Sequence, residues 1–201
     1  MSHLATLFEN NREWAESITK ENAAFFSESA KGQSPEYLWI GCADSRVPAN
    51  QLTNLPPGDM FVHRNIANVM VNTDLNSLSV LQYAVEVLKV KHIVVCGHYG
   101  CGGVKASMGD DQFGLIDNWL RHIKDVARLN ESELEGLGED EKFDRLCELN
   151  VKEQVINVAN NNIVKNAWAA GQELTVNGVI YDLKDGQLKD LDICIKSADE
   201  L

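Results

Sequence analysis

Two short clusters of metal-binding residue types, each directly after an apolar run, constrain the fold of this chain most. The first is Cys42-Ala43-Asp44-Ser45-Arg46, which follows the apolar run 37–40. The second is the stretch 96–103 (CGHYGCGG), which follows the apolar run 93–95. Such runs predict buried parallel strands, and open α/β sheets form their ligand crevice just past the carboxyl ends of strands. The two clusters are therefore expected to contribute to one site.

Cys42, His98 and Cys101 together offer two thiolates and one imidazole to a single metal ion. His98 and Cys101 are three positions apart, a spacing that lets both reach one ion from a turn or a helix start. Three protein ligands with a fourth position left for water indicate a catalytic zinc, because a closed structural zinc needs four ligands. Cys96 could be the fourth ligand only by leaving its apolar strand.

Asp44 and Arg46 place a carboxylate and a guanidinium beside this candidate site. In an extended segment alternate side chains point the same way, so Cys42, Asp44 and Arg46 are expected to face one cavity. The second cluster also contains glycines that let the backbone bend tightly and approach a small substrate, namely Gly97, Gly100, Gly102 and Gly103. A glycine-rich turn can also cradle phosphate, but GHYGCGG matches neither the dinucleotide-binding pattern nor the P-loop.

The rest of the chain alternates helical and extended patterns. Helices are expected over 3–30, 74–90 (with Asp74 as the N-cap), 114–129 and 140–168. Strands are expected over 37–40, 60–62, 93–96, 174–183 and 188–195, the last two joined by a hairpin turn with Asp185-Gly186 at its centre. This order predicts a single α/β domain over 1–201, with a mainly parallel central sheet, an antiparallel edge, flanking helices and a long N-terminal helix.

Charge and cysteine content narrow the classes of partner. The formal net charge of −12 argues against binding to nucleic acid and to anionic membranes. No segment approaches the roughly 20 apolar residues of a membrane span, and the N-terminus lacks the features of a signal peptide. An odd count of five cysteines favours a reducing, cytoplasmic compartment. Cys96, Cys147 and Cys194 are predicted to be ordinary buried thiols.

The motifs resemble those of the β-class carbonic anhydrases. The resemblance is carried by Cys-x-Asp-x-Arg at 42–46, His-x-x-Cys at 98–101, Arg64-Asn65-Ile66-Ala67-Asn68 and Gln82-Tyr83-Ala84-Val85. It implies one Zn²⁺ per subunit on Cys42, His98 and Cys101, and reversible hydration of CO2 to bicarbonate with Asp44 and Arg46 as catalytic residues. It also implies a homodimer or tetramer, and a substrate pocket lined by Gln33, Phe61, Tyr83, Gly102 and Gly103.

A narrower resemblance, to the bacterial bicarbonate-regulated branch of that family, is carried by Trp39, Arg64 and Tyr181. It implies a non-catalytic bicarbonate site at these residues. It further implies a closed state in which Asp44 leaves Arg46 and becomes the fourth zinc ligand. Three other functions remain open at this point: turnover of a CO2-like molecule such as carbonyl sulfide or carbon disulfide, a non-enzymatic bicarbonate sensor, and a metal-free binding module.

Overall fold

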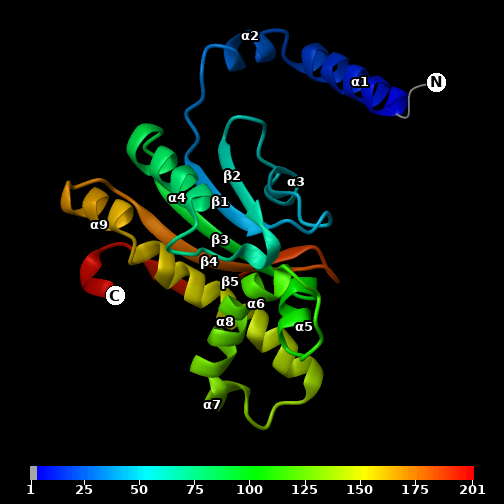
Figure 1. The fold of residues 1–201 in the computed structure, drawn as a ribbon. Coiled ribbons are helices and arrows are strands. Elements are labelled where there is room, and N and C mark those ends of the chain that lie inside the picture. The colour runs from blue at the N-terminus through cyan, green and yellow to red at the C-terminus, as the bar shows by residue number, and fades with distance from the viewer. Residues whose placement is uncertain (1–3) are drawn as a thin grey trace. The chain divides into compact units, whose positions relative to one another are not determined.

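The computed structural model describes residues 4–201, which divide into two compact units at Ser34/Pro35 (Figure 1). The first unit contains α1 (Ala5–Glu21) and α2 (Phe25–Ser29), and no residue of either helix is buried. The expected helix over 3–30 is therefore split, and its first residue lies outside the described range. Asn22 ends α1 in an extended conformation and accepts a hydrogen bond from the Ala24 N–H. Whether the two units act as one domain stays a prediction.

The second unit is built on a five-stranded sheet in the order β2-β1-β3-β4-β5. All neighbouring strands are parallel except β4 and β5, which form the antiparallel edge. This confirms the predicted fold class. The strands are β1 (Tyr37–Cys42), β2 (Met60–Asn65), β3 (His92–His98), β4 (Thr175–Asp182) and β5 (Gln187–Ile195).

The helices differ from expectation at their ends and in short segments. Asp74 caps α4 (Leu75–Gln82) through the N–H groups of Asn76 and Ser77, as predicted, but a π-helical turn (Tyr83–Val87) then replaces the α-helix. The expected helix 140–168 is two helices, α8 (Glu139–Ala159) and α9 (Asn162–Ala169), because Asn161 caps a new start. The others are α3 (Ala49–Thr53), α5 (Gly102–Ser107), α6 (Ile116–Leu129), α7 (Glu131–Leu134) and the 3-10 turns Ile66–Asn68 and Ala198–Glu200.

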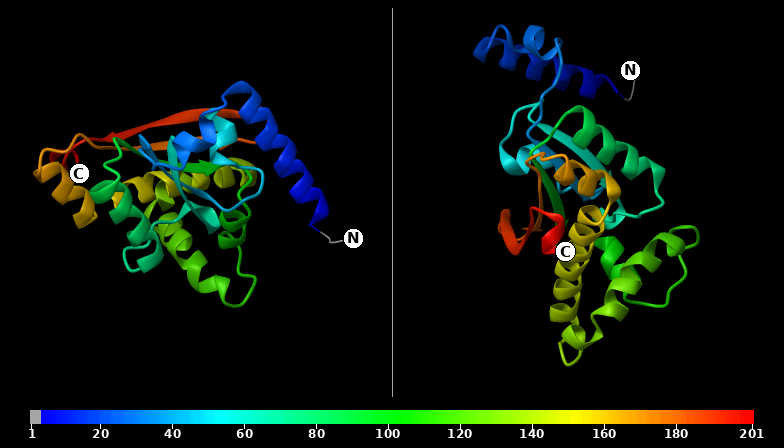
Figure 2. Two further views of the ribbon diagram at one scale, coloured as in Figure 1. Left: turned by 90° about the horizontal axis from the view of Figure 1, so that it is seen from above. Right: turned by 90° about the vertical axis from the view of Figure 1, so that its left-hand side faces the viewer.

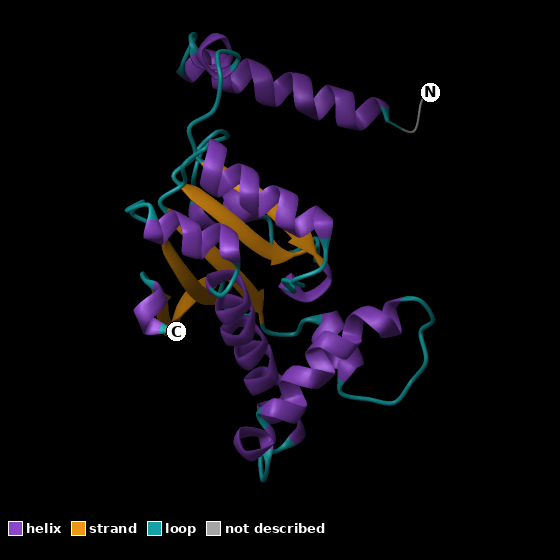
Figure 3. Cartoon of the chain, turned by 60° about the vertical axis from the view of Figure 1, so that its left-hand side comes forward, coloured by secondary structure: helices purple, strands orange, loops and turns teal. Residues whose placement is uncertain are grey.

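The two faces of the sheet are covered unequally, as Figures 2 and 3 show for the helices of this unit. Alternate strand residues such as Leu38 and Ile40 pack into a large apolar core with α4, α8 and α9. Trp39 points the other way, into a smaller cluster with Cys96 and with Leu52 of α3. A further core under α5, α6 and α8 lies at the carboxyl end of the sheet and includes Cys42.

Two expectations concern single features. Cys96 and Cys147 are buried as predicted, but Cys194 is exposed, so its predicted burial is wrong. It lies on the edge strand β5, where one face has no covering layer and apolar neighbours in sequence do not ensure burial.

Across the described part of the chain, no helix combines the length and the apolar character that a membrane crossing would require.

Candidate metal centre

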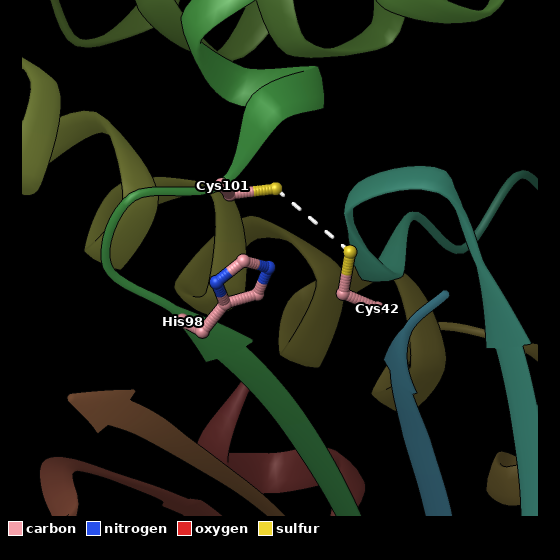
Figure 4. Close-up of side chains that lie close together, drawn as sticks. All are labelled: Cys42, His98 and Cys101. Atoms are coloured by element: carbon pink, nitrogen blue, oxygen red, sulfur yellow. Dashed lines mark hydrogen bonds between the residues drawn. The ribbon is translucent and has the colours of Figure 1, made fainter. Parts of the chain in front are cut away.

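Cys42, His98 and Cys101 converge at the carboxyl edge of the sheet (Figure 4). Cys42 is the last residue of β1 and His98 the last of β3, while Cys101 immediately precedes α5. Their candidate ligand atoms all lie within 4.8 Å of one another, and the two sulfur atoms are 3.9 Å apart. All three side chains are buried. The predicted convergence of the two clusters is therefore present in the fold.

The ring of His98 is oriented for metal binding. Its Nδ1–H donates to the carbonyl oxygen of Tyr99 at 3.0 Å, so Nε2 carries the free lone pair. This Nε2 is buried and has no hydrogen-bond partner among the described residues. A buried acceptor without a partner is costly, and a metal ion would satisfy it. Two sulfurs and one imidazole nitrogen form a donor set that suits zinc.

The two thiols form a coupled pair. The pKa of Cys42 is lowered, chiefly by its hydrogen bond with Cys101 and further by His98 and the backbone N–H groups of Asp44 and Ala67. The pKa of Cys101 is raised, because Cys42 is beside it and because it is buried. One proton is thus lost easily from the pair and the second with difficulty. A divalent cation would favour loss of both, since zinc binds thiolates.

Asp44 is held beside this cluster by Arg46. One carboxylate oxygen accepts the backbone N–H and the Nε–H of Arg46, both at 2.9 Å, and the other accepts from Nη2 at 2.7 Å. This bidentate pair holds the pKa of Asp44 well below its usual range. The same Oδ2 lies 3.8 Å from His98 Nε2. Asp44 is therefore ionised, and a small movement of its carboxylate toward His98 Nε2 would bring it to the candidate metal position.

The expected extended segment through Arg46 is not observed. β1 ends at Cys42, and Ser45 and Arg46 lie in a turn. The turn forms because the Asp44 side chain accepts the Arg46 N–H and the Asp44 carbonyl accepts the Val47 N–H at 3.1 Å. The ion pair therefore forms through a local turn and not through strand alternation.

Arg64 has a contact that the sequence did not indicate. Its Nε donates to the carbonyl of Cys42 at 2.8 Å, and its Nη2 donates to the carbonyl of Asp44. Arg64 pairs with Gly41 in the register of β2 against β1, which places its side chain beside the end of β1. In the sequence, only the place of Arg64 in the strand next to β1 could have indicated this contact. Arg64 thus fixes the backbone that carries one metal ligand and the catalytic candidate.

The remaining predicted residues are placed as follows. The rings of Phe61 and Tyr83 lie 5.8 Å apart, and Phe61 pairs with Leu38 rather than with the end of β1. Gln33 is exposed and belongs to the first unit. A Cβ on Gly103 would lie 2.8 Å from Ile66, whereas Gly102 has open space. The roles of these residues in a substrate pocket stay predictions.

Trp39 and Tyr181 pack in the same cluster on the thinly covered face of the sheet. The Trp39 side chain is buried, and its indole Nε1–H has no hydrogen-bond partner among the described residues. Arg64 is not part of that cluster and is engaged with the two carbonyls described above.

Comparison with known proteins links this arrangement to one family. A family profile described as carbonic anhydrase matches residues 37–188. A carbonic anhydrase of Emericella nidulans is 52% identical over 188 residues, which cover 93% of this chain and 82% of the relative. A β-carbonic anhydrase of Coccomyxa, solved with acetazolamide, superposes with a TM-score of 0.96 at 43% identity, covering 100% of this chain and 91% of the other. A tetrameric β-carbonic anhydrase of Sordaria macrospora has a TM-score of 0.90 at 41% identity, covering 94% and 97%.

Proposed function

The chain belongs to the β-class carbonic anhydrase family, and on this basis we propose that it hydrates CO2 reversibly to bicarbonate and a proton. The observation that carries the proposal is the cluster of Cys42, His98 and Cys101, with an unpartnered Nε2 facing the candidate metal position. These three residues would hold the zinc. When bound, zinc lowers the pKa of a coordinated water and so supplies the nucleophile, an effect for which carbonic anhydrases are themselves the standard example.

The chain's own residues prepare the site for this reaction. Asp44 Oδ2, beside His98 Nε2, is placed to accept a hydrogen bond from the reacting water. Arg46 keeps that carboxylate ionised and fixes its direction through the bidentate pair. The carbonyl of Tyr99 keeps Nδ1 of His98 protonated, so that Nε2 stays available. Burial of the three ligands excludes bulk water from their side of the site.

The primary test is the rate of CO2 hydration by the zinc-loaded full chain from mildly acidic to alkaline pH, with carbon disulfide hydrolysis as the comparison. We expect efficient CO2 hydration that rises steeply toward alkaline pH. Because Arg46 keeps the pKa of Asp44 low, this rise would not report protonation of Asp44 itself. Hydrolysis of carbon disulfide without CO2 hydration would contradict the proposal. A CO2 hydration rate that stays constant into mild acid would rule out a pH-dependent movement of Asp44 that blocks the metal position.

The gate is a movement of Asp44 between two partners. Paired with Arg46, it leaves the fourth metal position open; moved toward His98 Nε2, it would fill that position and stop the reaction. The present distance of 3.8 Å makes the required movement small. A bicarbonate ion that binds only the closed state would shift the population toward it in proportion to its differential affinity.

Arg64 supplies a physical link between such a bicarbonate site and the gate. Its guanidinium bonds the carbonyls of Cys42 and Asp44. A bicarbonate bound by Arg64 would compete for the same N–H groups and so loosen the segment that carries Asp44. The indole N–H of Trp39, buried without a partner, is a second donor for an anion. Tyr181 packs beside Trp39 and completes the proposed site.

We expect Trp39→Phe and Tyr181→Phe to weaken bicarbonate inhibition by about fivefold, the lower end of typical allosteric couplings, with CO2 hydration at alkaline pH unchanged. Tyr181→Phe removes only the hydroxyl, whereas Trp39→Phe removes the N–H together with the five-membered ring of the indole and keeps a six-membered aromatic ring. The measurement is the inhibition constant for bicarbonate near neutral pH. Trp14→Phe, in the first unit, is the matched control. Wild-type inhibition in both variants would contradict the regulatory site.

We also infer self-association. The second unit exposes large apolar side chains on and beside α4, including Leu75 and Val87 at 77% and 59% exposure, and the first unit exposes Leu7 and Phe8 at 62% and 63%. Large exposed apolar side chains can bury their surface against a second copy of the chain. The tetrameric state of the Sordaria macrospora relative supports a second copy of this chain as the partner.

A further inference from the structure

Tyr99 lies in the sequence between the candidate metal ligands His98 and Cys101, and it contacts residues of β3, β4, α8 and β5. Its carbonyl accepts the Nδ1–H of His98 at 3.0 Å, the bond that directs Nε2 toward the metal position. The following residue, Gly100, has a φ of +70°, a left-handed turn that leads the chain to Cys101. A shift of Tyr99 would therefore move the ring of one ligand and the backbone that delivers another.

Three contacts of Tyr99 hold it in place. Its backbone N–H donates to the carbonyl of Tyr181 on β4 at 3.0 Å. Its hydroxyl donates to a carboxylate oxygen of Glu148 on α8 at 2.6 Å, a short charge-assisted hydrogen bond. The ammonium group of Lys189 on β5 lies 5.3 Å from the centre of its ring.

Glu148 is itself anchored. Arg145, one turn earlier on α8, donates to the other carboxylate oxygen of Glu148 at 2.7 Å and also pairs with Glu133 of α7. The Glu148 side chain is 21% exposed, so solvent competes only partly for its oxygens. The side-chain anchor is thus a fixed carboxylate on a long, rigid helix.

We propose that Tyr99 is a positioning residue for the metal site: held by Glu148, it places the carbonyl that orients the His98 ring and the turn that delivers Cys101. The proposal rests on the zinc-dependent function above. It assigns α8, which provides no metal ligand, a role in how tightly and in what geometry the metal is bound. Outer partners of metal ligands commonly change metal affinity by about 10- to 100-fold.

The test uses the full chain with Tyr99→Phe, which removes only the hydroxyl, and Glu148→Leu, which removes the acceptor. Zinc affinity is measured by competition with a chelating dye, and site geometry by the visible spectrum of the cobalt-substituted protein. Because Tyr99 acts through a carbonyl, we expect the lower end of the range, about tenfold weaker zinc binding in each variant, with altered cobalt bands. Glu148→Gln retains an acceptor oxygen and should restore most of the affinity.

Two further proteins separate positioning from general destabilisation. Tyr37→Phe is the matched control, because Tyr37 begins β1 and lies at the opposite end of the strand from Cys42. The Tyr37→Phe protein should bind zinc as tightly as the wild type does. The double variant Tyr99→Phe/Glu148→Leu should be no weaker than Glu148→Leu alone, because one hydrogen bond is lost in both. Tight zinc binding and an unchanged cobalt spectrum in Tyr99→Phe would overturn the proposal, as would losses that multiply in the double variant. A wild-type protein that binds zinc but does not hydrate CO2 would contradict the function and leave this inference standing.

Discussion

Replacing Cys42 with serine is expected to lower zinc affinity by more than about 100-fold and to abolish CO2 hydration. Partners of metal ligands already account for about 10- to 100-fold in affinity, so loss of a ligand should exceed that range. A serine hydroxyl stays protonated where the Cys42 thiol, whose pKa is lowered by Cys101 and nearby N–H groups, readily becomes a thiolate. Elemental analysis after dialysis gives the zinc content, and the hydration assay gives the activity.

Cys194→Ser is the matched control for this change. Cys194 is exposed on β5 and outside the cluster, so its replacement should leave zinc content and CO2 hydration at wild-type levels. Stoichiometric zinc in the Cys42→Ser protein would show that Cys42 is not a ligand, and the assignment of the metal site would then be wrong.

Asp44→Asn is expected to slow CO2 hydration by about 100-fold or more while zinc remains bound, in line with the usual size of general acid–base contributions. Asparagine keeps the size of the side chain but has one acceptor oxygen, so it cannot form the bidentate bond with Arg46. The reacting water would lose a charged acceptor. The same variant cannot supply a carboxylate to the metal, so the fall in activity toward acid pH should become shallower.

Asp125→Asn provides the comparison for a similar pair elsewhere. Asp125 also faces an arginine, with Arg128 Nη2 at 3.2 Å, but both side chains are more than 60% exposed. Ion pairs between exposed side chains contribute little to the stability of the fold. A rate for Asp44→Asn equal to that of Asp125→Asn would remove Asp44 from the mechanism, and loss of zinc from Asp44→Asn would make it a structural metal ligand.

The convergence of Cys42, His98 and Cys101 could be predicted because it depends on local signals. Each ligand lies at or just past the end of a short apolar run, and parallel strands bring their carboxyl ends to one edge. The path of the chain at Arg46 could not be predicted from alternation. There a side chain bonds its own backbone two residues on and ends the strand, a competition that periodicity does not reveal.

Contacts between residues far apart in the sequence could not be predicted from sequence patterns either. Tyr99 and Glu148 are 49 positions apart, and their meeting depends on the rotation of α8 about its axis. The bonds from Arg64 to the carbonyls of Cys42 and Asp44 depend on the register of β2 against β1. Gln33, which motif matching assigned to the substrate pocket, belongs to the first compact unit, and its role in that pocket stays a prediction.

The spacing of the metal ligands has a consequence for folding. Cys42 and Cys101 are 59 positions apart, and the segment between them contains β2, α4 and β3. An ion held by both would close this long segment into a ring, and the loop-closure entropy of an unfolded chain grows with the length of the ring. Metal binding would therefore act as a reversible cross-link, so that resistance to unfolding rises with free zinc concentration and falls when a chelator is added.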